Sequence, residues 1–367
     1  MLKIICFYLP QFHETARNNA WWGKGYTDWN AAKNARPLFR GHMQPKKPLN
    51  DNYYDLSDET AKTLKWQAEL AKENGIYGFC IYHYWFAGEK MLEKPSEILL
   101  RHQEIDIHYT FCWDSGTWRR TWYADAAEQE VLIEQKFGDK QVWTRHFNDL
   151  LPFFQDRRYI KIDNKPVFHI YKASTIPCLQ EMKECWNTLA RENGFDGIYL
   201  ISGDIVDRKG DDRAIDAFYN YEPNRVFYDH RNSFFVKSAI IRAGILKRVN
   251  KIFGTRFLPD KRSAKMAYRK ISLHKDKTGA PKTYYGIFVN YDDTPRRQMR
   301  GAVYANNKLE YFEKCLETQI RESKRAANEF LYINAWNEWG EGAYLEPDEE
   351  YGTAYLECIR KVQDRNR

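Results

Sequence analysis

The chain has 367 residues, 16% of them aromatic, and a formal net charge of +7. No stretch approaches 18 consecutive apolar residues, so the sequence predicts no transmembrane helix, and the short apolar run at 2–9 contains Lys3 and stops at Pro10, unlike a signal peptide. The seven cysteines are odd in number and form no Cys-x-x-Cys motif, so we expect buried free thiols and a reducing, cytoplasmic location.

Short apolar segments alternate with longer amphipathic segments along the chain. The segments that predict strands are 2–9, 76–84, 107–113, 166–171, 197–202, 215–221, 283–290 and 329–336. The segments that predict helices are 57–75, with Ser57 as N-cap and Gly75 as the stop, and 94–102, 142–155, 176–192, 307–327 and 351–363. Continuous apolarity in the strands indicates that both of their faces are covered.

Eight strands alternating with helices predict an α/β fold of the (β/α)₈ TIM-barrel type. A doubly wound parallel sheet is the alternative. The barrel is favoured by the number of strands and by the absence of a glycine-rich phosphate loop after the first strand. We expect residues 1–367 to form a single catalytic domain.

A basic segment interrupts this pattern before the seventh strand. Residues 225–282 contain 16 Lys and Arg but three Asp and Glu, a net charge of +13, and we expect them to form a basic, partly helical insertion. Within it, residues 234–253 lack acidic residues, and a helix there would be basic on one side and apolar on the other. Such a helix can lie on an anionic membrane, pack its apolar face on the barrel or have that face covered by a partner subunit, and all three hypotheses stay open.

Aromatic and hydrogen-bonding side chains gather where five predicted strands end. Barrel enzymes bind their ligands at this end of the strands, and flat rings combined with Asp, Asn, His and Gln suit the apolar faces and hydroxyl groups of a sugar. The predicted sugar-binding residues are Tyr8, Gln11, His13, Trp29, His83, Tyr84, Trp85, Trp113, Asn290, Asp292, Trp336 and Asn337.

Two glutamates follow the last predicted strand, in the run INAWNEWGEGAYLEPD at 333–348. Cleavage of a glycosidic bond uses two carboxyl groups, and Glu338 and Glu341 are the candidates; a solvated surface pair is the alternative. There is no His-Glu-x-x-His, Cys/His zinc spacing, Gly-x-Ser-x-Gly or Asp-x-Asp, so we expect neither a metal nor a cofactor.

Several motifs together resemble the WbsX-like family, which is glycoside hydrolase family 99-like and associated with polysaccharide biosynthesis. The matching stretches are FYLPQFH (7–13), residues 21–49, YYDL (53–56), GIYGFCIYHYWFAG (75–88), residues 151–171 and residues 333–348. The resemblance implies a (β/α)₈ barrel and a more distant kinship with endo-α-mannosidases that retain the anomeric configuration. It further implies that Glu338 assists attack by the sugar's own 2-hydroxyl, that Glu341 is the acid and then the base, and that no metal is needed.

One stretch departs from the family pattern. Many WbsX-like sequences have W-A-N-E-N-W after the third strand, whereas this chain has Trp-Asp-Ser-Gly-Thr-Trp at 113–118. A carboxylate is therefore missing unless Asp114 replaces it, which puts the substrate in doubt more than the mechanism.

Three functions remain. We expect a retaining glycoside hydrolase; the alternatives are a glycosyltransferase or transglycosylase of surface polysaccharide assembly, and a non-catalytic glycan-binding protein. The expected partner is a glycan or lipid-linked oligosaccharide and not a nucleic acid. Peripheral contact with the inner face of the membrane through 234–253 is an added hypothesis.

Overall fold

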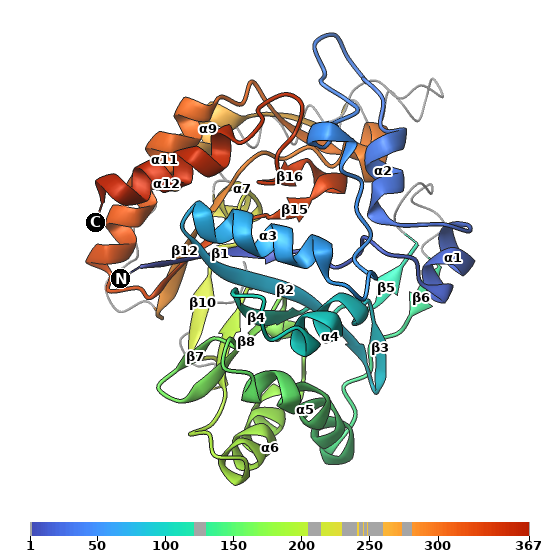
Figure 1. The fold of residues 1–367 in the computed structure, drawn as a ribbon, viewed down its shortest axis with the longest axis vertical. Helices are drawn as coiled ribbons and strands as arrows, with labels where there is room; N and C mark the ends of the chain where they lie inside the picture. Colours follow the sequence, from blue (N-terminus) through green and yellow to red (C-terminus); the bar gives the residue numbers. More distant parts are fainter. Residues whose placement is uncertain are drawn as a thin grey trace.

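The computed structural model describes residues 2–120, 130–204, 214–229, 260–273 and 281–366, and the isolated positions 241, 245 and 248. Eight parallel strands form a closed barrel at its centre (Figure 1). These strands are β1 (Lys3–Tyr8), β2 (Ile76–Phe86), β4 (His108–Trp113), β8 (Lys165–Ile170), β9 (Tyr199–Ser202), β10 (Ala217–Tyr219), β12 (Thr283–Phe288) and β14 (Phe330–Asn334). The barrel closes because β1 pairs with both β2 and β14, with Cys6 opposite Ile333. The predicted (β/α)₈ barrel is confirmed.

Helices cover the outside of the barrel. They are α3 (Lys62–Glu73), α4 (Lys94–Arg101), α5 (Lys140–Gln155), α6 (Leu179–Glu192), α7 (Asn224–Asp229), α9 (Ala264–Ser272), α11 (Leu309–Arg325) and α12 (Ala354–Arg365). Each long helix turns an apolar stripe inward: in α11 the buried Phe312, Leu316 and Ile320 are four residues apart, as one face of a helix requires. Helices α5 and α6 pack together at the lower end of the view, and α11 packs between α9 and α12 (Figure 1).

The first outer helix begins later than predicted. Helix α3 starts at Lys62 after Ala61, so the expected N-cap at Ser57 is wrong. Residues 58–60 instead form a turn, because the Asp58 carboxylate accepts hydrogen bonds from the backbone N–H and the hydroxyl of Thr60. The prediction that Gly75 ends this helix is confirmed: Gly75 lies just after the end of α3, with a φ of +78°.

Shorter elements complete the chain. They are α1 (Ala16–Trp22), α2 (Asp28–Asn34), α10 (Thr294–Arg297), η1 (Leu49–Asp51), η2 (Ala173–Thr175), η3 (Gln298–Arg300), η4 (Trp339–Glu341), β3 (Glu89–Met91), β5 (Trp118–Arg119), β6 (Val131–Ile133), β7 (Lys161–Ile162), β11 (Asp260–Ser263), β13 (Ala302–Ala305), β15 (Asn337–Glu338) and β16 (Ala343–Tyr344). Many of them follow the carboxyl ends of barrel strands, and there they build the walls of the site described below.

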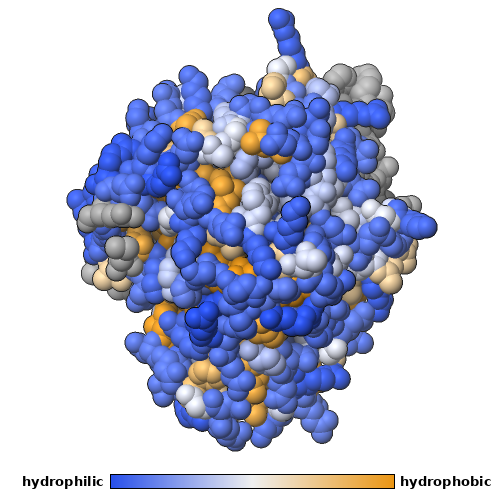
Figure 2. Space-filling view, in the orientation of Figure 1, coloured by the Kyte–Doolittle hydropathy of each residue, from blue (hydrophilic) through white to orange (hydrophobic). Residues whose placement is uncertain are grey.

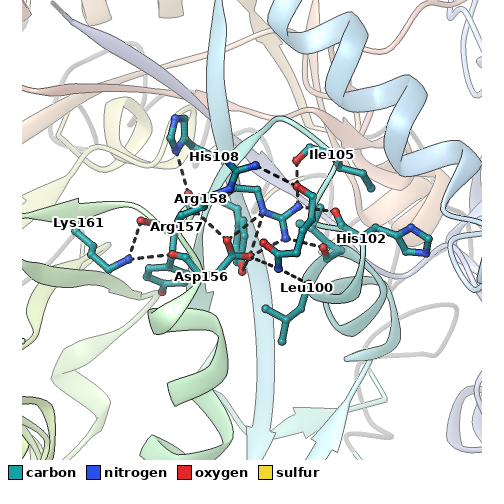
Figure 3. Close-up of polar contacts among 12 residues, drawn as sticks. Leu100, His102, Ile105, His108, Asp156, Arg157, Arg158 and Lys161 are labelled. Atoms are coloured by element: carbon teal, nitrogen blue, oxygen red, sulfur yellow. Dashed lines mark hydrogen bonds and ion pairs between the residues drawn. The ribbon is translucent and has the colours of Figure 1, made fainter. Parts of the chain in front are cut away.

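A buried arginine ties together the opposite, amino-terminal end of the barrel (Figure 3). The Arg158 guanidinium donates to the carbonyl oxygens of Leu99, His102 and Ile105 at 2.7–3.0 Å, and to the Asp156 carboxylate at 2.6 Å. Leu99 lies in α4, His102 and Ile105 lie in the loop between α4 and β4, and Asp156 and Arg158 lie in the loop between α5 and β7. At this end of a barrel, such a network serves stability and not chemistry.

The surface over α3 and α4 is mainly hydrophilic, with small apolar patches (Figure 2). Within the described ranges, no helix combines the length and the apolar character that crossing a membrane would need. Helices α7 and α9 lie between β10 and the seventh barrel strand, β12, where the basic insertion is predicted. The amphipathic segment 234–253 lies outside the described residues, apart from positions 241, 245 and 248.

Candidate active site

A cavity of about 340 Å³ opens at the carboxyl ends of the barrel strands. This is where barrel enzymes carry out their chemistry, and the volume is enough for a small ligand. The residues that line it are Leu9, Gln11, Asn18, Trp21, Trp22, Tyr82, Tyr84, Asp114, Thr117, Trp118, Arg119, Leu132, Tyr171, Tyr221, Arg296, Glu338 and Glu341. The wall thus combines aromatic rings with five charged side chains.

One arginine holds the two glutamates side by side. Arg296 is 4% exposed and donates from Nη1 to Glu341 Oε1 and from Nη2 to Glu338 Oε2, both at 2.9 Å. Its Nε donates to Asp28 Oδ1 at 3.0 Å. The planar guanidinium presents its donors in a fixed fork, so it sets the spacing of the three carboxylates.

The backbone around the glutamates is held in place by the first strand and by α2. Asn337 accepts a hydrogen bond from the Leu9 backbone N–H at 2.7 Å and donates to the Leu9 carbonyl at 3.0 Å. The Gly340 N–H donates to Asp28 Oδ2 at 2.9 Å. A Cβ at position 340 would lie 2.8 Å from both Asp28 carboxylate oxygens, so this approach requires glycine.

The cluster carries excess negative charge. Three carboxylates and one guanidinium sum to −2 when all are ionised, which is costly in a buried site. Burial raises the pKa of Glu338; Arg296 opposes this rise, and the charges of Glu341 and Asp28 add to it. A carboxylate with a raised pKa is a stronger base, and protonated it is an acid that works nearer neutral pH.

Tyrosines from several strands form the floor of the cavity. Tyr82 and Tyr84 point inward from β2, and the Tyr82 hydroxyl lies 2.9 Å from that of Tyr221, which follows β10. Burial raises the pKa of all three phenols, so they stay neutral and can act as hydrogen-bond donors. Trp118 packs edge-on against Tyr84, with ring centroids 4.9 Å apart, and continues the aromatic wall.

The structure places four of the fourteen predicted site residues in the cavity: Gln11, Tyr84, Glu338 and Glu341. Asp114, suggested as a replacement for the missing family carboxylate, also lines it. The other ten lie elsewhere, for two physical reasons.

The first reason is the alternation of side chains along a strand. In β2, His83 and Trp85 point to the outside of the barrel, where His83 Nε2 lies 2.9 Å from His146 Nε2 and Trp85 Nε1 donates to Asp149 at 2.8 Å. Trp113 packs edge-on against the same His146. Tyr8 likewise points outward and donates to Gln67 of α3 at 2.7 Å.

The second reason is that polar and aromatic side chains in the loops hold the loops together. Near the first strand, His13 Nδ1 lies 3.0 Å from the Pro10 carbonyl, and Trp29 Nε1 donates to the Tyr54 carbonyl. After the seventh strand, Asn290 accepts a hydrogen bond from the Tyr291 N–H, and Asp292 accepts one from Gln44 and lies 2.7 Å from His42 Nε2. After the eighth strand, Trp336 packs on Phe79, and Asn337 forms its hydrogen bonds with Leu9. These contacts support the loops around the cavity and do not face it.

Sequence reasoning missed Asp28, Arg296, Asn18, Tyr82 and Tyr221. Tyr82 was detectable, because it lies two residues before Tyr84 and so shares its face of the strand. Asp28 and Arg296 are 268 positions apart and carry no local signal of their contact. Within the described ranges, no group of three or more His, Cys, Asp or Glu side chains is arranged to hold a metal ion.

Comparison with known proteins gives a family and a fold. The family model described as Glycosyltransferase WbsX matches residues 4–359. Proteins of two Xanthomonas campestris pv. campestris strains, both described as Uncharacterized protein WxcX, are 30% identical over 99% of this chain. The match covers 50% of each relative, so the chain spans about half of their length.

Solved structures share the architecture at low identity. The GH99 endo-alpha-mannosidase from Bacteroides thetaiotaomicron superposes with a TM-score of 0.59 and 12% identity, covering 100% of this chain and 98% of that one. A glycoside hydrolase-like protein gives a TM-score of 0.55 at 12% identity, covering 98% and 93%. At these identities the likeness establishes the fold alone.

Proposed function

Because the chain belongs to the WbsX glycosyltransferase family, we propose that its barrel cavity is the active site of a carbohydrate-active enzyme, a retaining glycoside hydrolase that acts on a glycan. The observation that carries the proposal is the pairing of Glu338 and Glu341 on adjacent nitrogens of Arg296 in the cavity wall. Glycosidic bond cleavage needs two carboxyl groups that face one substrate, and here they lie beside aromatic surface on which a sugar can stack.

The two glutamates have environments that fit different roles. Glu338 is almost fully buried and its pKa is raised, so its carboxylate binds a proton more tightly than an ordinary glutamate does, which suits a base that assists the 2-hydroxyl of the sugar. The side chain of Glu341 is 20% exposed, so it can exchange its proton with water after each turnover, as an acid that later acts as a base must. The 2-hydroxyl-assisted route itself comes from the family resemblance.

Transfer to an acceptor is the second candidate, and the family's description as a glycosyltransferase favours it. The same two carboxyl groups serve if an acceptor hydroxyl, instead of water, attacks the sugar. The substrate would then be a growing glycan or a lipid-linked oligosaccharide. Contact of residues 234–253 with an anionic membrane stays a separate prediction.

Product analysis tests the proposal. The wild type is incubated with surface polysaccharides and lipid-linked oligosaccharides, and ¹H NMR records the anomer released first and any longer product. Glu338→Gln and Glu341→Gln should each lower the rate at least ~100-fold while the thermal melt is preserved. The matched control is Glu349→Gln, because Glu349 is an exposed glutamate of the same loop outside the cavity.

Each outcome has a distinct meaning. Retained anomeric configuration with both glutamates essential supports the hydrolase, whereas elongated products support transfer. Release of the opposite anomer would overturn the retaining mechanism. Glycan binding with no bond cleaved or formed by the wild type would leave the non-catalytic glycan-binding protein as the function.

A further inference from the structure

An asparagine in the cavity wall has an unusual hydrogen-bonding state. Asn18 is 1% exposed and lines the cavity, yet neither its Oδ1 nor its Nδ2 has a hydrogen-bond partner within the described part of the chain. A buried amide without partners is costly, and the large majority of buried polar side-chain atoms in folded proteins do have them. The helix does not need this side chain, because the Thr15 hydroxyl accepts from the backbone N–H of Asn18.

The neighbouring asparagine shows what a structural role looks like here. Asn19 Oδ1 accepts hydrogen bonds from the backbone N–H groups of Gly25 and Tyr26, and its Nδ2 donates to Glu14. Asn19 therefore holds the turn that follows α1. Asn18, on the same helix, does nothing comparable for the fold and faces the cavity instead.

The surroundings of Asn18 are rigid and aromatic. Trp21 and Trp22 follow it by three and four residues, so all three share one face of α1, and both rings line the cavity. Trp21 packs edge-on against Trp118, with centroids 6.0 Å apart. Arg120 donates to the Trp21 carbonyl at 2.7 Å and lies over the Trp22 ring, which fixes α1 against β5.

We propose that Asn18 is the polar centre of a sugar-binding subsite on the α1 side of the cavity. Its amide offers one acceptor atom and one donor group in a fixed plane, which matches two neighbouring hydroxyls of one uncharged sugar ring. Trp21 and Trp22 supply the apolar surface on which that ring stacks. The inference rests on the proposed function and adds to it the chemistry of one bound sugar: uncharged, with an adjacent pair of free hydroxyl groups.

The test measures the coupling between Asn18 and single hydroxyl groups. A glycan array of mono- to tetrasaccharides is probed with the Glu341→Gln variant, which keeps the cavity while slowing turnover. The tightest ligand is then compared by calorimetry with its set of monodeoxy analogues, in Glu341→Gln and in the same protein with Asn18→Leu, which keeps the branched shape of the side chain but removes both polar groups. Asn18→Leu should weaken binding of the parent sugar about tenfold or more. The one or two deoxy analogues that lack a hydroxyl paired with Asn18 should bind equally well to the proteins with and without Asn18→Leu.

Stability separates this role from a structural one. Asn18→Leu breaks no hydrogen bond to the described protein, so its melting temperature should equal or exceed that of its parent. Asn19→Ala, the matched control, should lower the melting temperature, because it removes three hydrogen bonds that hold the α1 turn.

The outcomes distinguish the subsite from the function on which it rests. If array glycans bind but Asn18→Leu keeps full affinity for the parent sugar, the subsite is wrong and the proposed function stands. The subsite is also wrong if Asn18→Leu lowers the affinity for every deoxy analogue by the same factor, because then no single hydroxyl pairs with Asn18. If no glycan binds, the proposed function fails and the subsite fails with it.

Discussion

Replacing Arg296 by methionine tests whether one buried cation holds the acidic cluster together. The substitution removes the partner of Asp28, Glu338 and Glu341 while keeping most of the side-chain volume. Removing one partner of a buried ion pair costs about 3–5 kcal/mol, because the opposite charge is left uncompensated. We therefore expect the free energy of unfolding of Arg296→Met to fall by about that amount at pH 7, and activity to be lost.

The pH dependence of the loss identifies its cause. Uncompensated carboxylates can reduce the cost by binding protons, so the folded variant holds more protons than the unfolded chain, and its stability must fall as the pH rises. Each carboxyl group that titrates in this way contributes about 1.4 kcal/mol per pH unit. Urea unfolding between pH 5 and 8 should therefore show the variant close to wild type at the acidic end and far below it at the alkaline end.

An arginine in an exposed ion pair provides the control. Arg101 and Glu59 are both more than half exposed and pair at 2.5 Å, so Arg101→Met should cost less than about 1 kcal/mol, with little change across this pH range. The reasoning is refuted if Arg296→Met unfolds at the same urea concentration as Arg101→Met at pH 7, or if its stability does not change between pH 5 and 8.

Three further predictions concern the same framework. Gly340→Ala should lower activity at least ~10-fold, because its Cβ would collide with Arg296 and Asp28; circular dichroism should show the barrel intact, and full activity would contradict the proposed contact. Arg158→Met should lose about 3–5 kcal/mol by urea unfolding while activity per folded molecule is unchanged, since Arg158 lies at the opposite end of the barrel; a loss of activity without a loss of stability would disprove this. Burial raises the folded-state pKa of Glu338 from its ordinary value of 4.5 to about 8, so this residue makes stability decline as the pH rises through that range; Glu338→Gln should flatten the decline expected in wild-type melting curves, and an unchanged slope would argue against the raised pKa.

The barrel was predictable because its signal is local and repeated. Each barrel strand is a continuous apolar run, and all eight predicted strands overlap an observed one. The two glutamates could be proposed from position alone, since residues that follow the last strand lie at the end of a barrel where ligands bind. The barrel and the loop that carries both glutamates therefore follow from the order of residues along the chain.

The rest of the site depends on which way a side chain points and on contacts across the chain. Tyr84 and Trp85 are adjacent and both aromatic, yet one lines the cavity and the other bonds Asp149 on the outside. Strand ends predict where ligand-contacting residues gather. Which side of the strand each side chain points to depends on the alternation of side chains along the strand, and this requires the register of the strand to be known to the residue. Arg296 and Asp28 meet through closure of the barrel, and the sequence around each of them contains nothing that indicates the other.

That same long-range assembly has a consequence for the chain as it is being synthesised. The charge cluster joins residues from distant parts of the chain. Asp28 follows the first barrel strand, Arg296 follows the seventh, and Glu338 and Glu341 follow the eighth. At about 5–20 residues per second, a ribosome needs roughly 15 to 60 s to proceed from position 28 to position 341. Asp28 lacks its cation until position 296 is made, and the first strand lacks the partner that closes the barrel until β14 is made. A nascent chain, or one whose translation stops early, therefore holds no complete acidic cluster, and the proposed active site forms only in the finished barrel.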